Sequence, residues 1–436
     1  MVANTKWNSL KNRLLKEVVG SFGLRVTYMG LTFLTNIILA RFLGATEFGI
    51  YTYTVAWSYL LAVFGTVGLD HLLVREVAIY KSQSAWGLLR GILRWANQIS
   101  LLISVTMALV AIALAYSFGI AKDSTTFIAF VVAMLSLPFA SLRNLRRGAM
   151  RGLQLVTIGL VPEMLIAPSA IVILTAGAYW LWGDRLNATW SVAIYTAITA
   201  ITLFISMVFL NRHLPPLVKT IPPDYKVRQW LYSALPFMLL EGIYVINARV
   251  DTLMLGWLQN VEAAGIYVPV NRGAQLINFV LMAITSALAP VIASLYAEGK
   301  KQKLHSTVVK TARAALIPTV VLTAILMIAA PWYLLLFGSE FVSGKNALYI
   351  LCIGQFLFTS TGLAGSLLNM TGNERFTAIS GGLSAILNII LNYFFITRWG
   401  VEGAATATSV SVIAMNLSNI IIVRRKLGIS STAFGL

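Results

Sequence analysis

Three arginines lie inside apolar stretches that are long enough to cross a membrane: Arg25, Arg249 and Arg272. No basic residue falls within any other apolar stretch that we identify. A cation at bilayer depth is costly unless it faces a partner or a water-filled cavity, so each arginine predicts a functional site. Because the planar guanidinium donates paired hydrogen bonds to phosphate and carboxylate oxygens, we expect the site to handle an anion.

Two carboxylates accompany Arg249 in the stretch 231–258. Glu241 lies about 15 Å along the helix from the start of this stretch, near the middle of the membrane. A carboxylate there can bind and release a coupling proton or sodium ion, and a static pair with an arginine of another helix is an equal alternative. Asp251 and Arg249 point about 200° apart on a helix and lie near the outer surface. We predict that they snorkel to the interface or form a gate contact there, with substrate binding as the alternative.

Polar side chains recur at helical spacing along three apolar stretches, which places each set on one helical face. Two of these stripes accompany an arginine: Ser21, Arg25, Tyr28, Thr32 and Asn36 in the first, and Tyr267, Asn271, Gln275 and Asn278 beside Arg272 in the second. The third comprises Ser380, Ser384, Asn388 and Asn392. Ser and Asn commonly join packed membrane helices, and we interpret the third stripe in that way. Because of their arginines, we interpret the other two as substrate-binding walls of a water-filled cavity.

Glu163 lies between two prolines, Pro162 and Pro168, near the start of the stretch 156–182. Proline removes a backbone donor and disturbs a helix. We therefore predict an irregular or kinked segment here, in which Glu163 compensates the freed backbone groups.

The composition places these side chains on membrane helices. The chain of 436 residues is 58% hydrophobic and 11% charged, and its mean hydropathy is +0.80. Such values are typical of an all-α integral membrane protein. A span needs roughly 20 apolar residues. We predict twelve spans, at 18–40, 48–69, 98–118, 127–142, 156–182, 188–210, 231–258, 264–294, 314–337, 347–368, 377–397 and 404–423.

The net charge of +18 reflects membrane topology and not nucleic-acid binding. With a cytoplasmic N-terminus, the predicted inner segments hold 25 of the 33 Lys and Arg residues and the outer loops hold five. This asymmetry follows the positive-inside rule, so we predict a multi-pass protein with both termini in the cytoplasm. The inner segments also favour contact with anionic membrane lipid.

A short motif, Gly-Ile-Tyr, occurs at residues 49–51 and again at 265–267, after 216 residues. This offset is about half the chain, which indicates an internal duplication. Six spans in each half imply a parallel repeat about an axis along the membrane normal. We expect an N-terminal six-helix lobe at 1–210, a proline-rich cytoplasmic linker at 211–230 and a C-terminal six-helix lobe at 231–436.

Cysteine and histidine usage indicates no metal site and no cofactor. The single Cys352 excludes an intramolecular disulfide and a cysteine metal site. The three histidines, His71, His213 and His305, are dispersed over the predicted inner loops. We interpret them as solvated surface residues and not as a ligand set.

Motifs in three parts of the chain point to one family. They are RFLGATEFGIY at 41–51 with REVA at 75–78, RGAMRGLQ at 147–154, and a C-terminal set of 369–373, Asn388, Asn392 and GVEGAATAT at 400–408. In these motifs the chain resembles bacterial polysaccharide repeat-unit flippases, the Wzx-type exporters of O-antigen and exopolysaccharide. That family belongs to the multidrug/oligosaccharidyl-lipid/polysaccharide exporter superfamily.

The resemblance implies a two-lobed flippase, not an enzyme, in a bacterial cytoplasmic (inner) membrane. Its cargo would be an undecaprenyl-diphosphate-linked oligosaccharide, moved from the inner to the outer leaflet by ion-coupled alternating access. In related lipid-linked precursor flippases, cavity arginines of spans 1 and 8 serve the diphosphate, and Arg25 and Arg272 occupy similar places. The implied partners are the lipid-linked oligosaccharide, membrane lipid and a proton or sodium ion, with a polysaccharide polymerase as a candidate protein partner.

Two other classes remain as alternatives. A drug or cation antiporter of the same superfamily would share the architecture, but its cavity should be anionic or apolar, which the two arginines oppose. A membrane polymerase or ligase would need a sizeable outer loop with acidic or histidine catalytic groups, and the predicted outer loops are short. A passive pore would not need arginines on buried helix faces.

Overall fold

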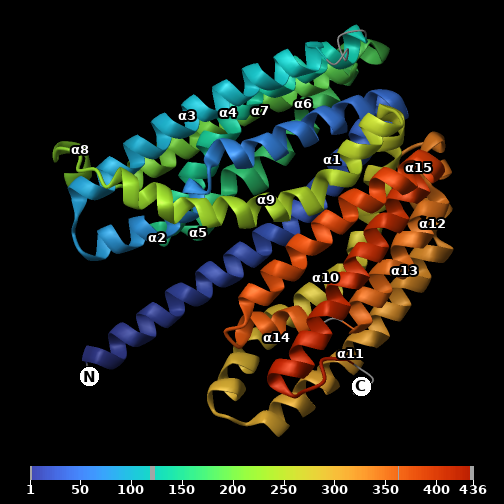
Figure 1. The fold of residues 1–436 in the computed structure, drawn as a ribbon. Helices are drawn as coiled ribbons and strands as arrows, with labels where there is room; N and C mark the ends of the chain where they lie inside the picture. Colours follow the sequence, from blue (N-terminus) through green and yellow to red (C-terminus); the bar gives the residue numbers. More distant parts are fainter. Residues whose placement is uncertain (1, 118–122, 362, 433–436) are drawn as a thin grey trace. The chain divides into compact units, whose positions relative to one another are not determined.

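The computed structural model describes residues 2–117, 123–361 and 363–432, and within these ranges it contains helices and no β-strand (Figure 1). The all-α membrane fold predicted from composition is confirmed. The chain forms two compact units. Unit 1 comprises Met1–Leu43 and Thr54–Val245, and unit 2 comprises Gly44–Tyr53 and Ile246–Leu436.

Two long helices belong partly to each unit, α1 (Val2–Thr66) and α9 (Val227–Leu258). The other helices of unit 1 are α2 (Leu69–Ser82), α3 (Trp86–Ser117), α4 (Ser124–Gly152), α5 (Val156–Val161), a π-helix (Pro162–Ile166), α6 (Ala167–Trp182), a 3-10 turn (Gly183–Arg185), α7 (Ala188–His213) and α8 (Leu217–Thr220). Those of unit 2 are α10 (Val261–Ala297), α11 (Lys301–Ile328), α12 (Ala330–Leu335), a 3-10 helix (Ser339–Gly344), α13 (Lys345–Thr361), α14 (Ala364–Met370) and α15 (Glu374–Leu427). The border between the units falls inside α9, beyond the linker predicted at 211–230.

Within the described ranges, nine helices are long and apolar enough to cross a membrane, or ten if the bent α10 counts as one span. The number is below twelve because α1 and α15 each join two predicted spans. Each joint is a glycine with positive φ, Gly44 at 72° and Gly400 at 55°. Glycine reaches this region without steric cost, so both positions are bends between helical segments. Every predicted span therefore maps onto a helical segment.

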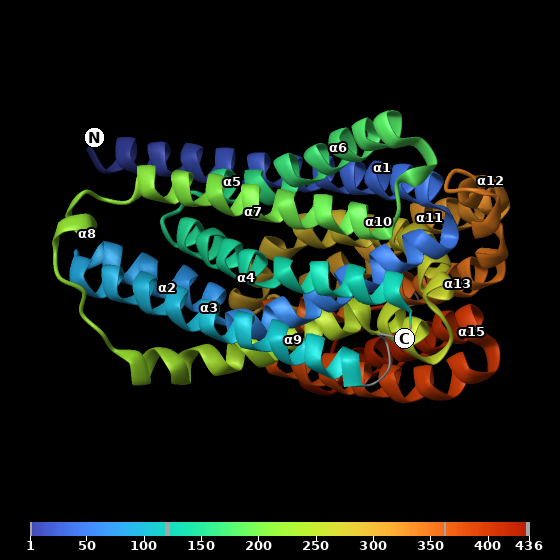
Figure 2. The ribbon, with the colours of Figure 1, turned by 90° about the horizontal axis from the view of Figure 1, so that it is seen from above.

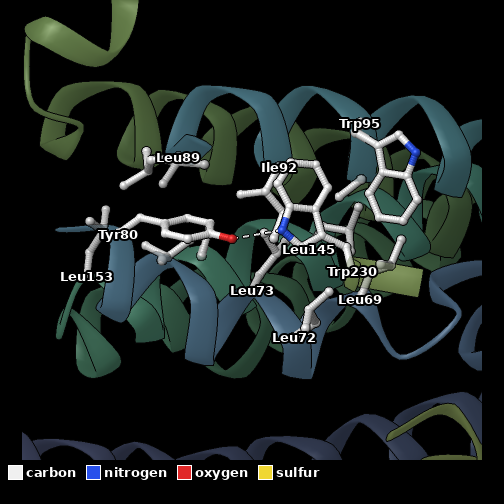
Figure 3. Packing of buried hydrophobic residues seen from close by; sticks show 14 of the residues in the cluster. Leu69, Leu72, Leu73, Tyr80, Leu89, Ile92, Trp95, Leu145, Leu153 and Trp230 are labelled. Carbon is white, nitrogen blue, oxygen red and sulfur yellow. Dashed lines mark hydrogen bonds between the residues drawn. The ribbon is translucent and has the colours of Figure 1, made fainter. Parts of the chain in front are cut away.

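The core of unit 1 forms where α2, α3 and α4 pack against one another, with α7 along the other side of α4 (Figures 2 and 3). Leu72 of α2, Ile92 of α3 and Leu145 of α4 are completely buried there. Trp230, from the first turn of α9, enters the same cluster, and its Nε1 donates a hydrogen bond of 2.8 Å to the hydroxyl of Tyr80. This core fixes the beginning of α9 against α2.

The two copies of the Gly-Ile-Tyr motif pack against each other inside unit 2. A Cβ atom on Gly49 would lie 2.0 Å from the carbonyl oxygen of Val261, and one on Gly265 would lie 2.6 Å from that of Ala45. Only glycine allows such close backbone approach. Gly265 is the equivalent of Gly49 and Val261 that of Ala45 under the 216-residue offset, so the contact is reciprocal. The amide of Ala45 also donates a hydrogen bond of 2.6 Å to the carboxylate of Glu340, which caps the helical segment after Gly44.

Candidate functional site

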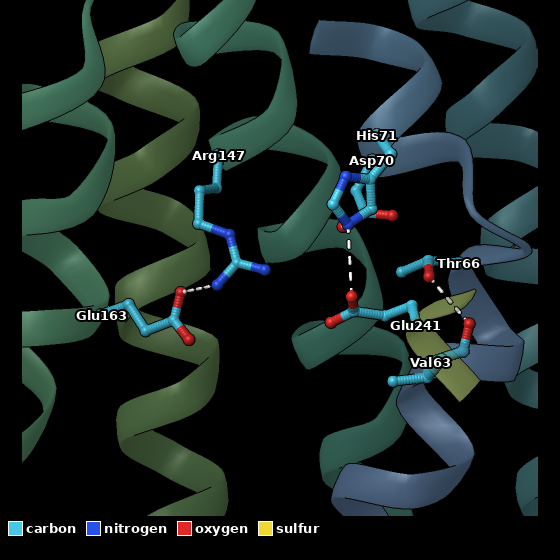
Figure 4. A network of polar contacts seen from close by, with 7 residues as sticks. All are labelled: Val63, Thr66, Asp70, His71, Arg147, Glu163 and Glu241. Carbon is cyan, nitrogen blue, oxygen red and sulfur yellow. Dashed lines mark hydrogen bonds and ion pairs between the residues drawn. The ribbon is translucent and has the colours of Figure 1, made fainter. Parts of the chain in front are cut away.

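Glu241 lies near the middle of α9 and faces the first turn of α2 in unit 1 (Figure 4). Its Oε2 is 3.3 Å from Nε2 of His71, and Oδ2 of Asp70 is 3.9 Å from the same nitrogen. The side chains of His71 and Glu241 are 35% and 32% exposed, so water reaches both. The hydrogen bond with Glu241 is the main cause that raises the pKa of His71 above its ordinary value, against the opposing effect of burial.

The close approach of α2 to α9 positions this pair. Gly68 precedes α2 with φ at 70°, and a Cβ atom there would lie 2.5 Å from backbone atoms of Ala234 and Met238. The imidazole of His71 also stacks on Phe237, with ring centroids 5.8 Å apart and planes tilted by 20°. Because Phe237 precedes Glu241 by one helical turn, a single face of α9 holds the histidine.

A second ion pair lies beside the first and joins α4 to the π-helix (Figure 4). Nη1 of Arg147 is 2.6 Å from Oε2 of Glu163, and the two side chains are 22% and 16% exposed. The predicted irregular segment is therefore present as the π-helix, but its carboxylate bonds a guanidinium. Arg147 also lies within electrostatic range of Asp70 and Glu241.

Sequence reasoning missed these partners because it treated 143–155 and His71 as loop. Helix α4 continues through Gly152, so Arg143 and Arg146 are 5% and 8% exposed on a helix that passes through the core of unit 1. Arg146 donates a hydrogen bond to Asn97. The basic residues that follow the predicted span 127–142 thus lie on a helix and not in a loop. Arginines recur every four residues around the buried Leu145, as they would on a helix. This spacing was the sequence signal that the helix continues past residue 142.

The first predicted stripe lies on the part of α1 that belongs to unit 1. Arg25 is exposed, and among the described residues it has neither a hydrogen bond nor an ion pair. Tyr28 is half-buried, and its carbonyl accepts a hydrogen bond of 2.8 Å from Thr32. Asn36 Nδ2 in turn donates to the carbonyl of Thr32 at 2.6 Å. The structure does not test whether this face binds substrate, and that role stays a prediction.

The second predicted stripe lies on α10 in unit 2, where Tyr267 is buried and Asn271, Gln275 and Asn278 are half-buried. Gln275 Nε2 donates a hydrogen bond of 3.2 Å to Oδ1 of Asn271. Oδ1 of Asn278 is buried and has no hydrogen-bond partner among the described residues. Arg272 and Arg249 are also half-buried. Substrate binding by the stripe and gating by Arg249 are untested predictions.

Asp251 is the centre of a polar network inside unit 2. It is 5% exposed and accepts hydrogen bonds from Tyr267 at 2.8 Å, Asn392 at 2.7 Å and Thr408 at 2.6 Å. Asn388 links Asn392 and Thr408 within the same network. Depth along the helix had led us to expect a position near the outer surface, but depth does not reveal the neighbours that cover a side chain. The gate role of Asp251 stays a prediction.

The two networks offer different chemistry. In unit 1, Glu163 faces the cation Arg147 and Glu241 faces the titratable His71, whereas within the described ranges only neutral groups hydrogen-bond to Asp251. Carboxylate, amide and hydroxyl oxygens are the ligands that hard cations prefer, so the unit 2 network can hold a proton or a small cation. The part of the chain that the structure describes contains no cluster of three or more His, Cys, Asp or Glu side chains able to hold a metal ion.

Two family models match the chain. The model described as "Polysaccharide biosynthesis protein" matches residues 14–296, and the MatE model matches residues 236–394. The first match covers more than half of the chain.

Curated relatives are distant. An uncharacterized membrane protein of Methanocaldococcus jannaschii is 20% identical over 87% of this chain and 77% of its own length. A probable low-salt glycan biosynthesis flippase of Haloferax volcanii is 22% identical over 43% of this chain and 40% of its own length. The probable multidrug resistance protein NorM of Bacillus subtilis is 28% identical over 39% and 38%. The matched region thus spans less than half of the last two relatives.

Two solved structures share the fold. An inward-facing multidrug resistance MATE family transporter of the MOP superfamily has a TM-score of 0.75 at 13% identity, with 92% of this chain and 94% of that chain covered. The lipid II flippase MurJ in an inward closed conformation has a TM-score of 0.68 at 13% identity, with 94% and 87% covered. At such identities the likeness extends to the fold alone.

Proposed function

Because this chain belongs to the polysaccharide biosynthesis protein family of membrane transporters, we propose that it flips an undecaprenyl-diphosphate-linked oligosaccharide from the inner to the outer leaflet of a bacterial cytoplasmic membrane. It is a multi-pass transporter of the MOP superfamily and not an enzyme. The family match over residues 14–296 is the observation that carries the proposal. The proposal includes cytoplasmic termini and a polysaccharide polymerase as a partner.

Exposed cations support a diphosphate cargo. Arg25 on α1 and Arg151 near the end of α4 are exposed, lie within electrostatic range of each other and have no ion pair among the described residues. Two neighbouring guanidinium groups repel each other, and a nearby anion relieves this repulsion. Bidentate pairs of guanidinium with phosphate are also strong. In the proposal, Arg272 and its polar stripe on α10 provide further contacts to the cargo.

Ion coupling requires a group whose charge or occupancy differs between the states of the carrier. We assign this role to Glu241, which water reaches and which lies near Arg147 and Arg151. Asp251 is a second candidate, because the buried Oδ1 of Asn392 beside it has no hydrogen-bond donor among the described residues. A cation bound there would contact both the carboxylate oxygen of Asp251 and Oδ1 of Asn392.

Complementation tests the cargo assignment. Arg25→Ala and Arg272→Ala should abolish surface polysaccharide in a flippase-deficient strain while the protein stays in the membrane. Arg398→Ala is the matched control, because this arginine is exposed and lies outside both stripes. Normal surface polysaccharide from both cavity variants would overturn the assignment.

A drug or cation antiporter is the second candidate function, favoured by the MatE match over residues 236–394 and by the NorM relative. Expression in a strain without its own efflux pumps separates the two functions. An antiporter should raise resistance to a cationic dye such as ethidium and should fail to restore surface polysaccharide. A flippase should give the reverse result.

A further inference from the structure

His71 is a titratable group that the proposed transport cycle has not yet used. It lies in the first turn of α2, and its ring is held by two residues of one α9 face: Phe237 stacks on it and Glu241 hydrogen-bonds to it. The Gly68 contact brings the two helices close enough for this pairing. The imidazole and the carboxylate can therefore share one proton in the hydrogen bond between them.

We propose that His71 and Glu241 form one proton-binding site, in which the coupling proton resides on the imidazole and not on the carboxylate alone. This inference rests on the coupling role proposed for Glu241. Proton binding converts the pair from a net charge of −1 to a neutral ion pair, since the histidine becomes cationic beside the anionic carboxylate.

Two elements, α2 and α4, bring other charged groups to this pair. Asp70 of α2 lies 3.9 Å from Nε2 of His71 and favours the protonated imidazole. Arg151 of α4 opposes protonation, and Arg147 of α4 acts on Glu241. The hydrogen bond and the charge of Glu241 together with Asp70 outweigh burial and Arg151, so the pKa of His71 is raised. A raised value brings the titration of a histidine closer to neutral pH.

The proton on this pair controls how the neighbouring arginines can bind an anion. Without the proton, Glu241 carries an unbalanced negative charge that attracts Arg147 and Arg151. With the proton, His71 neutralises that charge. Arg151, which has no ion pair among the described residues, is then available to a phosphate-bearing headgroup, while Arg147 stays paired with Glu163. Proton uptake thus strengthens the anion site and proton release weakens it, which gives the carrier states of different affinity.

Nuclear magnetic resonance can observe the proton site directly, because the chain has only three histidines. In protein with labelled imidazole carbons, the signal lost in His71→Gln identifies His71, and the exposed His213 serves as the internal control. We expect His71 to titrate above the ordinary histidine value of about 6.5 and to shift to lower pH in Glu241→Gln. Titration of His71 that is unaffected by Glu241→Gln would overturn the proton-sharing pair.

Binding of inorganic pyrophosphate tests the consequence. Purified protein should bind this probe several-fold more tightly at pH 6 than at pH 8. His71→Arg keeps a cation beside Glu241 but cannot titrate, so it should bind tightly at both pH values. A merely structural histidine would leave the pH dependence intact in His71→Arg, which would overturn the proposal. Absence of pyrophosphate binding at any pH would count against the diphosphate cargo, whereas the resonance titration would still decide the proton site.

Discussion

Glu241 and Asp251 lie ten residues apart on α9, yet the two units surround these carboxylates in opposite ways. In unit 1, Glu241 faces His71, and a second carboxylate beside it faces Arg147, at positions that water reaches. In unit 2, Asp251 is buried among a phenol, an amide and a hydroxyl. A titratable cation beside a carboxylate makes the charge of the site depend on pH. A buried carboxylate that is surrounded by neutral donors keeps an unbalanced charge, which a bound proton or cation would neutralise.

The largest expected loss of stability comes from removing the carboxylate at the centre of the unit 2 network. Asp251→Ala leaves three buried donors without their acceptor, and we expect the free energy of unfolding to fall by roughly 3–4 kcal/mol. Glu241→Ala is the matched control, because its partly exposed pair should cost less than about 1 kcal/mol. Thermal unfolding of the purified variants measures both. Equal losses would remove the distinction between the two sites.

The Arg147–Glu163 pair of unit 1 has side chains that are only 22% and 16% exposed, and it should show the next largest effect. Arg147→Ala strands Glu163 without its cation, and we expect a loss of about 2–3 kcal/mol. Replacing both residues by apolar ones, Arg147→Met with Glu163→Leu, should recover much of that loss because no unpaired charge remains. If the double variant were less stable than the single one, charge pairing would not explain this site.

The close approach of α2 to α9 should contribute less to the stability of unit 1. Gly68→Ala places a methyl group 2.5 Å from the α9 backbone and strains a position with φ at 70°, so a loss of roughly 1–2 kcal/mol is expected. Gly177 is the control, because it lies within α6 with open space around its Cα and Gly177→Ala should be neutral or slightly stabilising. In Gly68→Ala the resonance of His71 should also titrate at lower pH. An unchanged titration would show that α2 and α9 do not need this contact to form the pair.

The smallest expected effect is a pH dependence of stability that arises in unit 1. A raised pKa means that the His71–Glu241 pair stabilises the fold fully below the ordinary histidine value of about 6.5 and loses that contribution as pH rises through the higher folded value. The melting temperatures of wild type and His71→Gln should therefore differ at low pH and converge at high pH. Asp251→Asn, compared in the same way, should not show this convergence. A difference independent of pH would remove His71 as the titrating group.

Hydropathy located the helices because a membrane demands long apolar runs, and Gly44 and Gly400 fell in the predicted gaps between spans. It did not reveal that α4 extends into the basic run after residue 142, since helix packing in unit 1 provides partners that hydropathy does not count. The pairing of Arg147 with Glu163 was missed for that reason.

The depth of a residue along its helix also does not define which residues surround it. Glu241 was expected near the middle of its span, and it lies near the middle of α9. Its partner His71, however, comes from the first turn of α2, which follows Gly68. Asp251 was expected near an exposed end, yet residues more than 130 positions later, Asn392 and Thr408, cover it. Spacing within one helix carries no information about such neighbours.

The reciprocal contact of Gly49 and Gly265 has the form of an isologous interface, in which each partner offers the same surface to the other. Such interfaces normally join two chains of a dimer, whereas here both copies lie on one chain and in one compact unit. The segment Gly44–Tyr53 comes from the N-terminal half of the sequence but belongs to the unit that the C-terminal half mainly builds, as an exchanged element does in domain swapping. The two halves are consequently not interchangeable modules, and a gene fragment that encodes the second half alone would lack part of its own core.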